Sequence, residues 1–296
     1  MTDLTANQLT AMSRLFSSSV IQEMARRGKS PLFTRLANEC SLLTKHSPRD
    51  HVFDVFDAAF SILRQRGNRD EYVYKAALVQ KVLLGKHSLH TASMLAEFRV
   101  KECKADLCIL NGTSTVYEIK SERDSLSRLE RQVAAYSDVF ARVYVIAAEN
   151  HIDSVSSSVP KHVGLLCLNK RHQISSVRES ADRPQHTCPA AIFDSLRTSE
   201  ALAVLELCGI ALPSVPNTEL RSAARKLFVR LTPRKAHSGM VQVLKQSRNL
   251  LPLSTLVAQL PSSLQTAALS VPLRRLDHER LVAAVNTRLE DAQAWA

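Results

Sequence analysis

The chain has 296 residues, enough for one large domain or for two to three small ones, and 45% of them are hydrophobic. No apolar run approaches the roughly 18 residues of a membrane-spanning helix, and residues 1–4 do not begin a signal peptide. These features favour a cytoplasmic protein that does not contact membranes. The net charge of +11 favours polyanionic partners such as nucleic acid, but a basic protein without such a partner has the same charge.

The first region, residues 1–66, is predicted to be helical. Leu9, Met12 and Leu15 recur at helical spacing, and an apolar series between residues 53 and 63 does the same. Gly67-Asn68 interrupts the pattern, and a further helix is predicted from residue 71 to about 85.

After residue 87 the apolar period changes to that of β-strands. Short β-type runs are predicted at residues 105–110, 115–120, 142–147 and 163–168, with a helix at about 125–140. Asn111-Gly112 indicates a hairpin, because both residues tolerate the positive φ of tight turns. The predicted order from residue 71 is helix, strand, strand, strand, helix, strand, which is a mixed α/β layer structure.

The remaining chain is predicted to be a polar, proline-containing linker at residues 178–190 and an all-α domain at residues 191–296. Residues 219–248 contain many basic residues and a single acid. They indicate either a solvated helix face or a surface that tracks nucleic acid through phosphate contacts. The candidate contact residues of this surface are Arg221, Arg225, Lys226 and Arg230.

The candidate chemistry lies in the predicted hairpin. Glu-x-Lys occurs at Glu118-Ile119-Lys120 and again at Glu102-Cys103-Lys104, so the motif alone is weak. On a strand, Glu118 and Lys120 share one face, and Asp106 lies one hairpin away. We therefore expect Tyr117 and Ile119 to pack in the core and the charged pair to point into a cleft. The alternative is a solvated face of an edge strand.

The helix that follows supports a site beside this hairpin. Leu126, Leu129, Val133, Tyr136 and Phe140 form its apolar stripe. At 100° per residue, Ser125, Arg128 and Gln132 are predicted to cluster on one flank, where a phosphate or a water molecule could be bound. An ordinary polar face, with Asp124 and Arg128 paired, is the alternative.

An acid in one strand, Glu-x-Lys-Ser in the next and a helix with Gln132 and Tyr136 together resemble the PD-(D/E)XK nuclease superfamily. The resemblance covers roughly residues 70–175, and within the superfamily this stretch looks like a bacterial family of predicted stand-alone nucleases. It implies a restriction-endonuclease-like core at residues 67–177.

The resemblance also implies roles for individual residues. Asp106 and Glu118 would be metal ligands, with the Ile119 carbonyl as a third and Glu97 as a candidate additional ligand. Lys120 would position or activate water, and Gln132 would bind a phosphate or tune the site. Oxygen ligands favour Mg²⁺ or Mn²⁺.

The sequence therefore predicts a divalent-metal-dependent nuclease that cleaves nucleic acid, with DNA favoured over RNA. The resemblance suggests a role in host defence or in a mobile element. Two alternatives stay open: a catalytically inactive nuclease fold that binds nucleic acid or a partner protein, and a nuclease subunit active only in a complex. Self-association is also open.

Overall fold

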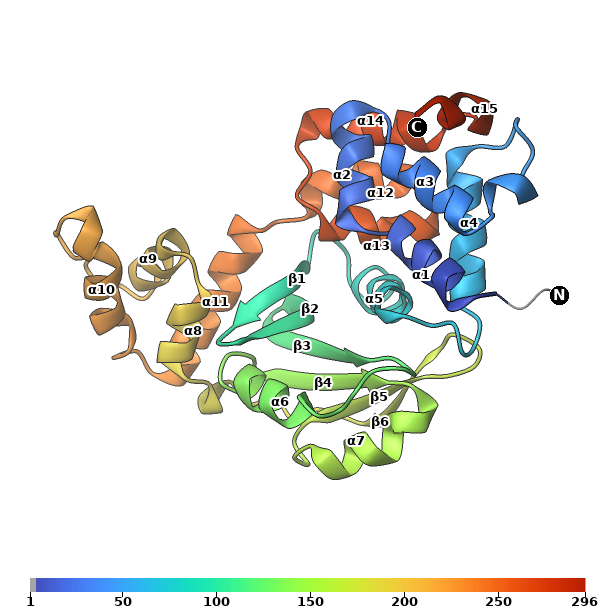
Figure 1. Cartoon of the computed structure of the whole chain (residues 1–296). Helices are drawn as coiled ribbons and strands as arrows, with labels where there is room; N and C mark the ends of the chain where they lie inside the picture. The colour runs from blue at the N-terminus through green and yellow to red at the C-terminus, as the bar shows by residue number, and fades with distance from the viewer. Residues whose placement is uncertain (1–3, 296) are drawn as a thin grey trace. The chain divides into compact units, whose positions relative to one another are not determined.

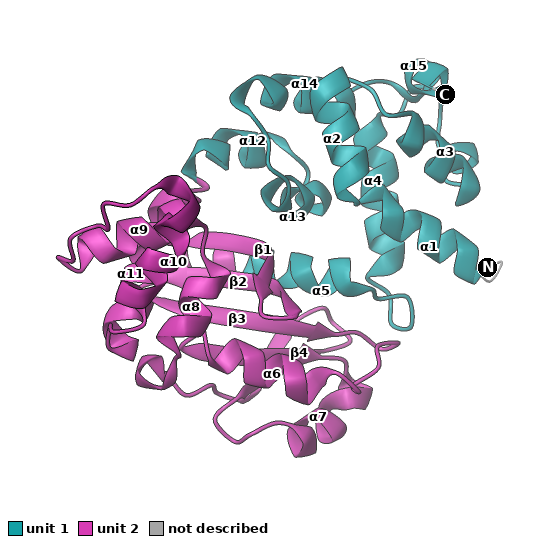
Figure 2. Cartoon of the chain, turned by 60° about the vertical axis from the view of Figure 1, so that its left-hand side comes forward, with its two compact units in different colours: residues 1–82, 251–296 teal, residues 83–250 magenta. Residues whose placement is uncertain are grey.

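The structure, a computed structural model, describes residues 4–295 (Figure 1). The chain divides into two compact units (Figure 2): a helical unit of residues 1–82 and 251–296, and a sheet unit of residues 83–250. No helix in the described part of the chain is long and apolar enough to cross a membrane. The molecule is mixed α/β, as predicted.

The helical unit joins the two ends of the chain. The described helices from its N-terminal part are α1 (Ala6–Leu15), α2 (Ser18–Arg27), α3 (Pro31–Glu39), α4 (Val52–Leu63) and α5 (Glu71–Leu78), which a π-helical turn (Val79–Leu83) follows. Those from its C-terminal part are α12 (Ser254–Gln259), α13 (Ser262–Ser270), α14 (Arg275–Val285) and α15 (Leu289–Ala292). Helix α14 contacts α2 and α4, and α13 contacts α2, α4 and α5. The predicted helical character of residues 4–66 is confirmed.

The sheet unit is built on one six-stranded mixed sheet in the order β1-β2-β3-β4-β5-β6. Its strands are β1 (Ser93–Val100), β2 (Cys103–Asn111), β3 (Thr113–Lys120), β4 (Arg142–Ala147), β5 (Gly164–Leu168) and β6 (Ile174–Arg178). Strands β1 to β3 form an antiparallel meander, β3, β4 and β5 are parallel, and β6 is antiparallel to β5. The two parallel pairs need crossovers, which α6 (Leu129–Ser137) and α7 (Ile152–Ser158) supply.

The four strands predicted from apolar runs are present, and their hairpin is confirmed. Gly112 alone separates β2 from β3 and has a φ of 69°, whereas Asn111 does not enter the left-handed region. The predicted runs include neither β1 nor β6. Strand β6 escapes sequence patterns because its central residues are exposed and three of its five residues are polar or charged, with no apolar alternation. It is recognisable only through its pairing with β5.

One face of the sheet is covered by helices from both sides of the predicted linker. Helix α6 contacts β2 and β4, and α11 (Pro233–Ser247) contacts β2 and β3. Val116 and Val145 from the sheet, Val133 from α6 and Met240 from α11 share one apolar core. The remaining helices of this unit are α8 (Pro189–Ser195), α9 (Thr198–Leu207) and α10 (Asn217–Phe228).

The observed division therefore differs from the predicted boundaries. Residues 178–190 pack on the sheet unit instead of linking two domains, since the Arg183 N–H donates to the Ala141 carbonyl at 2.9 Å and the Cys188 N–H donates to the Asp138 carbonyl at 2.7 Å. The predicted domain of residues 191–296 is split, because α8 to α11 belong to the sheet unit and α12 to α15 to the helical unit.

The bounds predicted for the helix at 125–140 are wrong. The Asp124 carboxylate accepts hydrogen bonds from the Ser121 N–H and hydroxyl, both at 2.7 Å. Such a local bond favours a turn over a helix, and α6 begins only at Leu129. Ser125 and Arg128 thus precede the helix, so the flank predicted for them with Gln132 does not exist.

Candidate active site

Glu118 and Lys120 lie beneath α6 on the central strand β3. Strand alternation places both on the same face as Val116, which belongs to the core under α6. The side chains of Glu118 and Lys120 are only 2% and 6% exposed, and Lys120 Nζ lies 2.8 Å from Glu118 Oε1. Because β3 pairs on both sides, the edge-strand alternative is excluded. The prediction that the pair faces an open cleft is also wrong, since both side chains are buried.

The opposite face of β3 is buried as well. Tyr117 and Ile119 are 7% and 3% exposed, and the Tyr117 ring stacks on that of Tyr144 with 5.6 Å between centroids. The prediction that these two residues pack inside the protein is confirmed.

Two residues of α6 complete the polar cluster around Glu118. Lys120 Nζ donates to Gln132 Oε1 at 3.1 Å. The Tyr136 hydroxyl lies 2.9 Å from Glu118 Oε2 and 3.0 Å from the Lys104 carbonyl, and it can donate to either. Both oxygens of Glu118 therefore have a hydrogen-bond partner.

The sequence analysis placed Tyr136 in the apolar stripe and in the helix motif of the resemblance, but it assigned Tyr136 no role at the site and missed its contact with Glu118. The signal that could have found it is its spacing from Gln132, because residues at i and i+4 of a helix are neighbours on its surface.

Burial dominates the electrostatics of this cluster. It raises the pKa of Glu118, while the charge and hydrogen bond of Lys120, and then the hydrogen bonds of Tyr136 and Gln132, act in the opposite direction. Burial also raises the pKa of Tyr136, and the charges of Glu118 and Asp106 raise it further. Asp106 is thus electrostatically close to the same tyrosine as Glu118.

Asp106 lies where β2 and β3 separate. Their pairing runs from Asn111–Thr113 to Leu107–Tyr117. Beyond it, Asp106 Oδ2 accepts a hydrogen bond from the Ile119 N–H at 2.7 Å. The Ile119 N–H thus donates to this carboxylate instead of to a backbone carbonyl of β2, and the bond holds the Asp106 side chain beside the Glu-x-Lys segment.

Glu97 is the second carboxylate at this position. Ala96 pairs with Leu107 and Phe98 with Ala105, which places Glu97 opposite Asp106. A carboxylate oxygen of each residue lies within 4.8 Å of the other. Glu97 also forms an ion pair with Lys104, and its φ of 56° is uncommon for a residue other than glycine. The structure thus brings Glu97 together with Asp106, and Glu118 together with Lys120 and Gln132.

The predicted basic contact residues fall into two groups. Arg221 donates to the Leu196 carbonyl and the Thr198 hydroxyl, both at 3.2 Å, and Arg225 donates to both carboxylate oxygens of Asp194, at 3.0 and 3.1 Å. These two arginines hold α10 against α8 and α9, and the acid that offsets Arg225 comes from outside the basic stretch.

Arg128, Lys226 and Arg230 are exposed, and their side chains make no hydrogen bond or ion pair with the described residues. They are the predicted contact residues whose charges point to solvent.

The family model described as bacteriophage P4 protein cII matches residues 64–249. Protein cII of Enterobacteria phage P4 is 34% identical over 110 residues, which are 36% of this chain and 40% of the phage protein. The alignment therefore spans less than half of that relative. No solved structure matches the chain. The family match contains every candidate site residue from Glu97 to Tyr136 and most of the sheet unit, and the chain belongs to the bacteriophage P4 protein cII family.

Proposed function

We propose that the protein hydrolyses phosphodiester bonds of nucleic acid with the help of a divalent cation. The observation that carries this proposal is the buried Glu118–Lys120 pair, joined by Gln132 and adjacent to Asp106. Burying two charges costs several kcal/mol per ion, and a buried ion pair seldom stabilises a fold more than apolar residues of the same volume would. Such groups are therefore candidates for a functional site.

The element order supports a restriction-endonuclease-like core. Along the chain, α5, β1, β2, β3, α6 and β4 follow one another as helix, three meander strands, helix and strand, and β4 lies parallel to β3. In the PD-(D/E)XK superfamily, which the sequence resembles, the acid lies on one strand and Glu-x-Lys on the next. Asp106 and Glu118 are on β2 and β3.

The carboxylates at Asp106 have the oxygen donors that a hard cation prefers. Two oxygens bound to one Mg²⁺ at about 2.1 Å are at most about 4.2 Å apart. Glu97 and Asp106 present oxygens within 4.8 Å of each other, so a small side-chain movement would let both bind one cation. The Ile119 carbonyl leaves β3 on the same edge as the Ile119 N–H, which faces Asp106. Glu118 could join as a ligand once Lys120 or Tyr136 releases one of its oxygens.

The bound cation would offset negative charge on the phosphoryl oxygens and lower the pKa of a water molecule. Lys120 would orient that water or the phosphate, because its ammonium has three donors and two of them already meet Glu118 and Gln132. Tyr136 would fix the Glu118 carboxylate. The burial of Glu118, Lys120 and Tyr136 would keep the ammonium in one position.

Nucleic acid is the proposed partner, with DNA preferred over RNA. The net charge of +11 supports a polyanionic substrate, and the exposed Arg128, Lys226 and Arg230 are the proposed phosphate contacts. Since Phe228, the aromatic residue between Lys226 and Arg230, is buried and cannot stack on a base, we propose contacts to the backbone with little sequence preference. The phage source of the relative supports a role in a mobile element, and host defence stays a proposal that rests on the resemblance alone.

A second candidate function rests on Glu118. Both of its oxygens already accept hydrogen bonds, an arrangement that also suits an inactive nuclease fold in which the cluster only stabilises the sheet. Such a protein would bind nucleic acid or a partner protein, or would act as a subunit of a nuclease complex.

Cleavage by the purified full chain tests the proposal. Single- and double-stranded DNA and RNA are incubated with Mg²⁺, Mn²⁺ or EDTA, and Asp106→Asn and Lys120→Met are assayed beside the wild type. Glu206→Gln, an exposed carboxylate on α9, is the matched control. We expect cleavage that needs the metal, persists in the control and is lost in both site variants. Cleavage that survives both variants refutes the proposal, and DNA binding without cleavage under all conditions supports the second candidate.

A further inference from the structure

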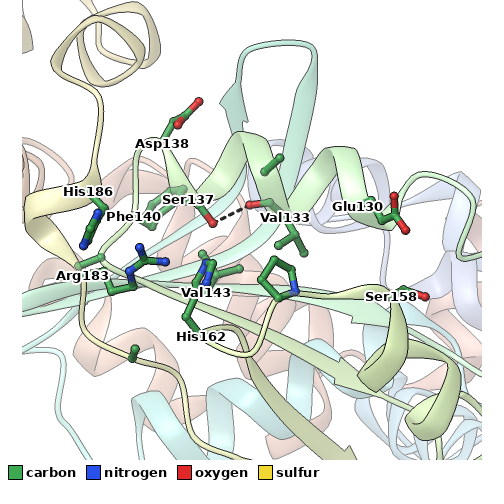
Figure 3. Close-up of a pocket in the computed structure, with 14 residues that line it drawn as sticks. Glu130, Val133, Ser137, Asp138, Phe140, Val143, Ser158, His162, Arg183 and His186 are labelled. Atoms are coloured by element: carbon green, nitrogen blue, oxygen red, sulfur yellow. Dashed lines mark hydrogen bonds between the residues drawn. The ribbon is translucent and has the colours of Figure 1, made fainter.

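A cavity of about 530 Å³ lies in the sheet unit, between α6, the start of β4, the segment after α7 and the segment after β6 (Figure 3). This volume is in the usual range for small-molecule sites. Glu118, Lys120 and Gln132 do not line it. Glu130 and Ser137 of α6 line the cavity. On another flank of the same helix, Gln132 contacts Lys120 and Tyr136 contacts Glu118.

One end of the cavity collects basic side chains. Figure 3 shows Arg183, His162 and His186 close together and turned towards the same space. The Nε2 atom of His162 is buried and has no hydrogen-bond partner among the described residues. Within that part of the chain, the side chains of Arg183 and His186 make no hydrogen bond or ion pair either. Buried polar atoms nearly always have a partner, so the unpartnered Nε2 atom of His162 is unusual. The half-buried Arg183 guanidinium adds donors that no described residue uses.

The charge at this end is positive and is not offset within the cavity. Burial, followed by the charges of Arg183, His186 and Arg178, lowers the pKa of His162. Of the two acids in the lining, Asp138 is paired with Lys101 and Glu130 lies at the opposite end in Figure 3. An anionic group would therefore be bound at the Arg183 end.

The middle of the cavity is apolar. Val133 from α6, Phe140, and Val143 from β4 lie between the basic end and Glu130 in Figure 3, and Pro160 also lines the cavity. A ligand that fills the space thus needs an anionic group at one end, a body that tolerates an apolar surface, and a hydrogen-bond donor near Glu130.

We propose that this cavity binds a small organic monophosphate with a ring, of the nucleoside monophosphate class. The phosphate accepts hydrogen bonds from Arg183 and His162, because a guanidinium fork and an imidazole match phosphate oxygens. The ring lies on Val133 and Pro160, and an amino group of the base donates to Glu130. The site is separate from Asp106 and Glu118, and it does not depend on nuclease activity.

Binding to the full-length protein in EDTA tests this site independently of any metal. Isothermal titration with adenosine 5′-monophosphate, adenosine and inorganic phosphate compares the whole ligand with its two parts. We expect the nucleotide to bind at least about tenfold more tightly than either part, and Arg183→Gln to weaken it by about tenfold or more. Arg183→Lys should weaken it less. Arg275→Gln, which removes an exposed arginine of α14 outside the cavity, should leave affinity unchanged.

Three results would overturn the proposal. One is no binding of the nucleotide at millimolar concentrations, and another is equal affinity of wild type and Arg183→Gln. The third is equal affinity for inorganic phosphate and nucleotide, which removes any role for the ring. If Arg183→Gln does not fold, as judged by circular dichroism, the exposed His186→Ala variant replaces it with the same expected loss.

Discussion

The Lys120→Met substitution should destabilise the sheet unit far more than an ordinary lysine substitution would. Methionine preserves most of the volume but leaves the Glu118 carboxylate, 2% exposed, without its counter-charge. At 2.8 Å and an effective dielectric constant of about 20, the Coulomb attraction of the pair is about 6 kcal/mol. Desolvation of the two ions offsets most of this gain. When one partner is removed, the desolvation cost of the other is no longer offset. We therefore expect the free energy of unfolding of Lys120→Met to be about 3–5 kcal/mol lower than that of the wild type.

The double variant Glu118→Gln/Lys120→Met separates charge from packing. It removes both buried charges, while the glutamine oxygen still accepts from the Tyr136 hydroxyl. Replacing both partners of a buried pair is often neutral or stabilising, so we expect the double variant to be within about 1 kcal/mol of the wild type. Under the proposed function, the same folded variant is inactive. The double variant would then keep its stability and lose its activity. If the ion pair were only structural, a variant of unchanged stability would keep its activity.

Urea denaturation at pH 7, followed by far-UV circular dichroism, measures the stability of the variants. The single tryptophan, Trp295, belongs to the helical unit and does not report on the sheet unit. Amide hydrogen exchange in β3 and β4 supplies the local measurement. Equal stability of wild type and Lys120→Met would refute the buried-pair reasoning. A double variant as unstable as the single one would show that packing, not charge, determines the loss.

Three further results are expected. Burial lowers the pKa of His237 to about 4, so the wild type should lose up to about 3 kcal/mol as the pH falls from about 6.5 to 4, where only the unfolded state binds the proton. His237→Gln, which can keep the bond to Ser114, should lack this loss in urea denaturation at pH 7 and 4.5, and an unchanged pH dependence would contradict the assignment. Lys226→Gln combined with Arg230→Gln should reduce the slope of log K for DNA against log salt by about 2, and an unaltered slope would remove both from the interface. Asp106→Asn, whose amide oxygen can still accept from the Ile119 N–H, should lose cleavage by about 100-fold or more while staying folded. Full activity of that variant would exclude Asp106 as a metal ligand.

Local sequence signals determined much of the fold. Apolar runs located β2 to β5, because strand formation depends on a short alternating or fully buried pattern. Gly112 positioned the hairpin between β2 and β3, since the turn needs a positive φ there. Helical spacing identified the apolar face of α6 but not its start, which the side chain of Asp124 displaces to Leu129.

The sequence by itself also placed Asp106, Glu118 and Lys120 on neighbouring strands, since a tight hairpin leaves little freedom in the register of its arms. Only the tertiary structure decided that Glu118 and Lys120 are buried, because their exposure depends on where α6 crosses the sheet. The contact of Tyr136 with Glu118 has the same origin. The division of the chain was also a tertiary result: α11 packs on the sheet and α14 on the N-terminal helices. The apolar stripe of a helix shows that it needs a partner, but it does not specify which distant surface will cover it.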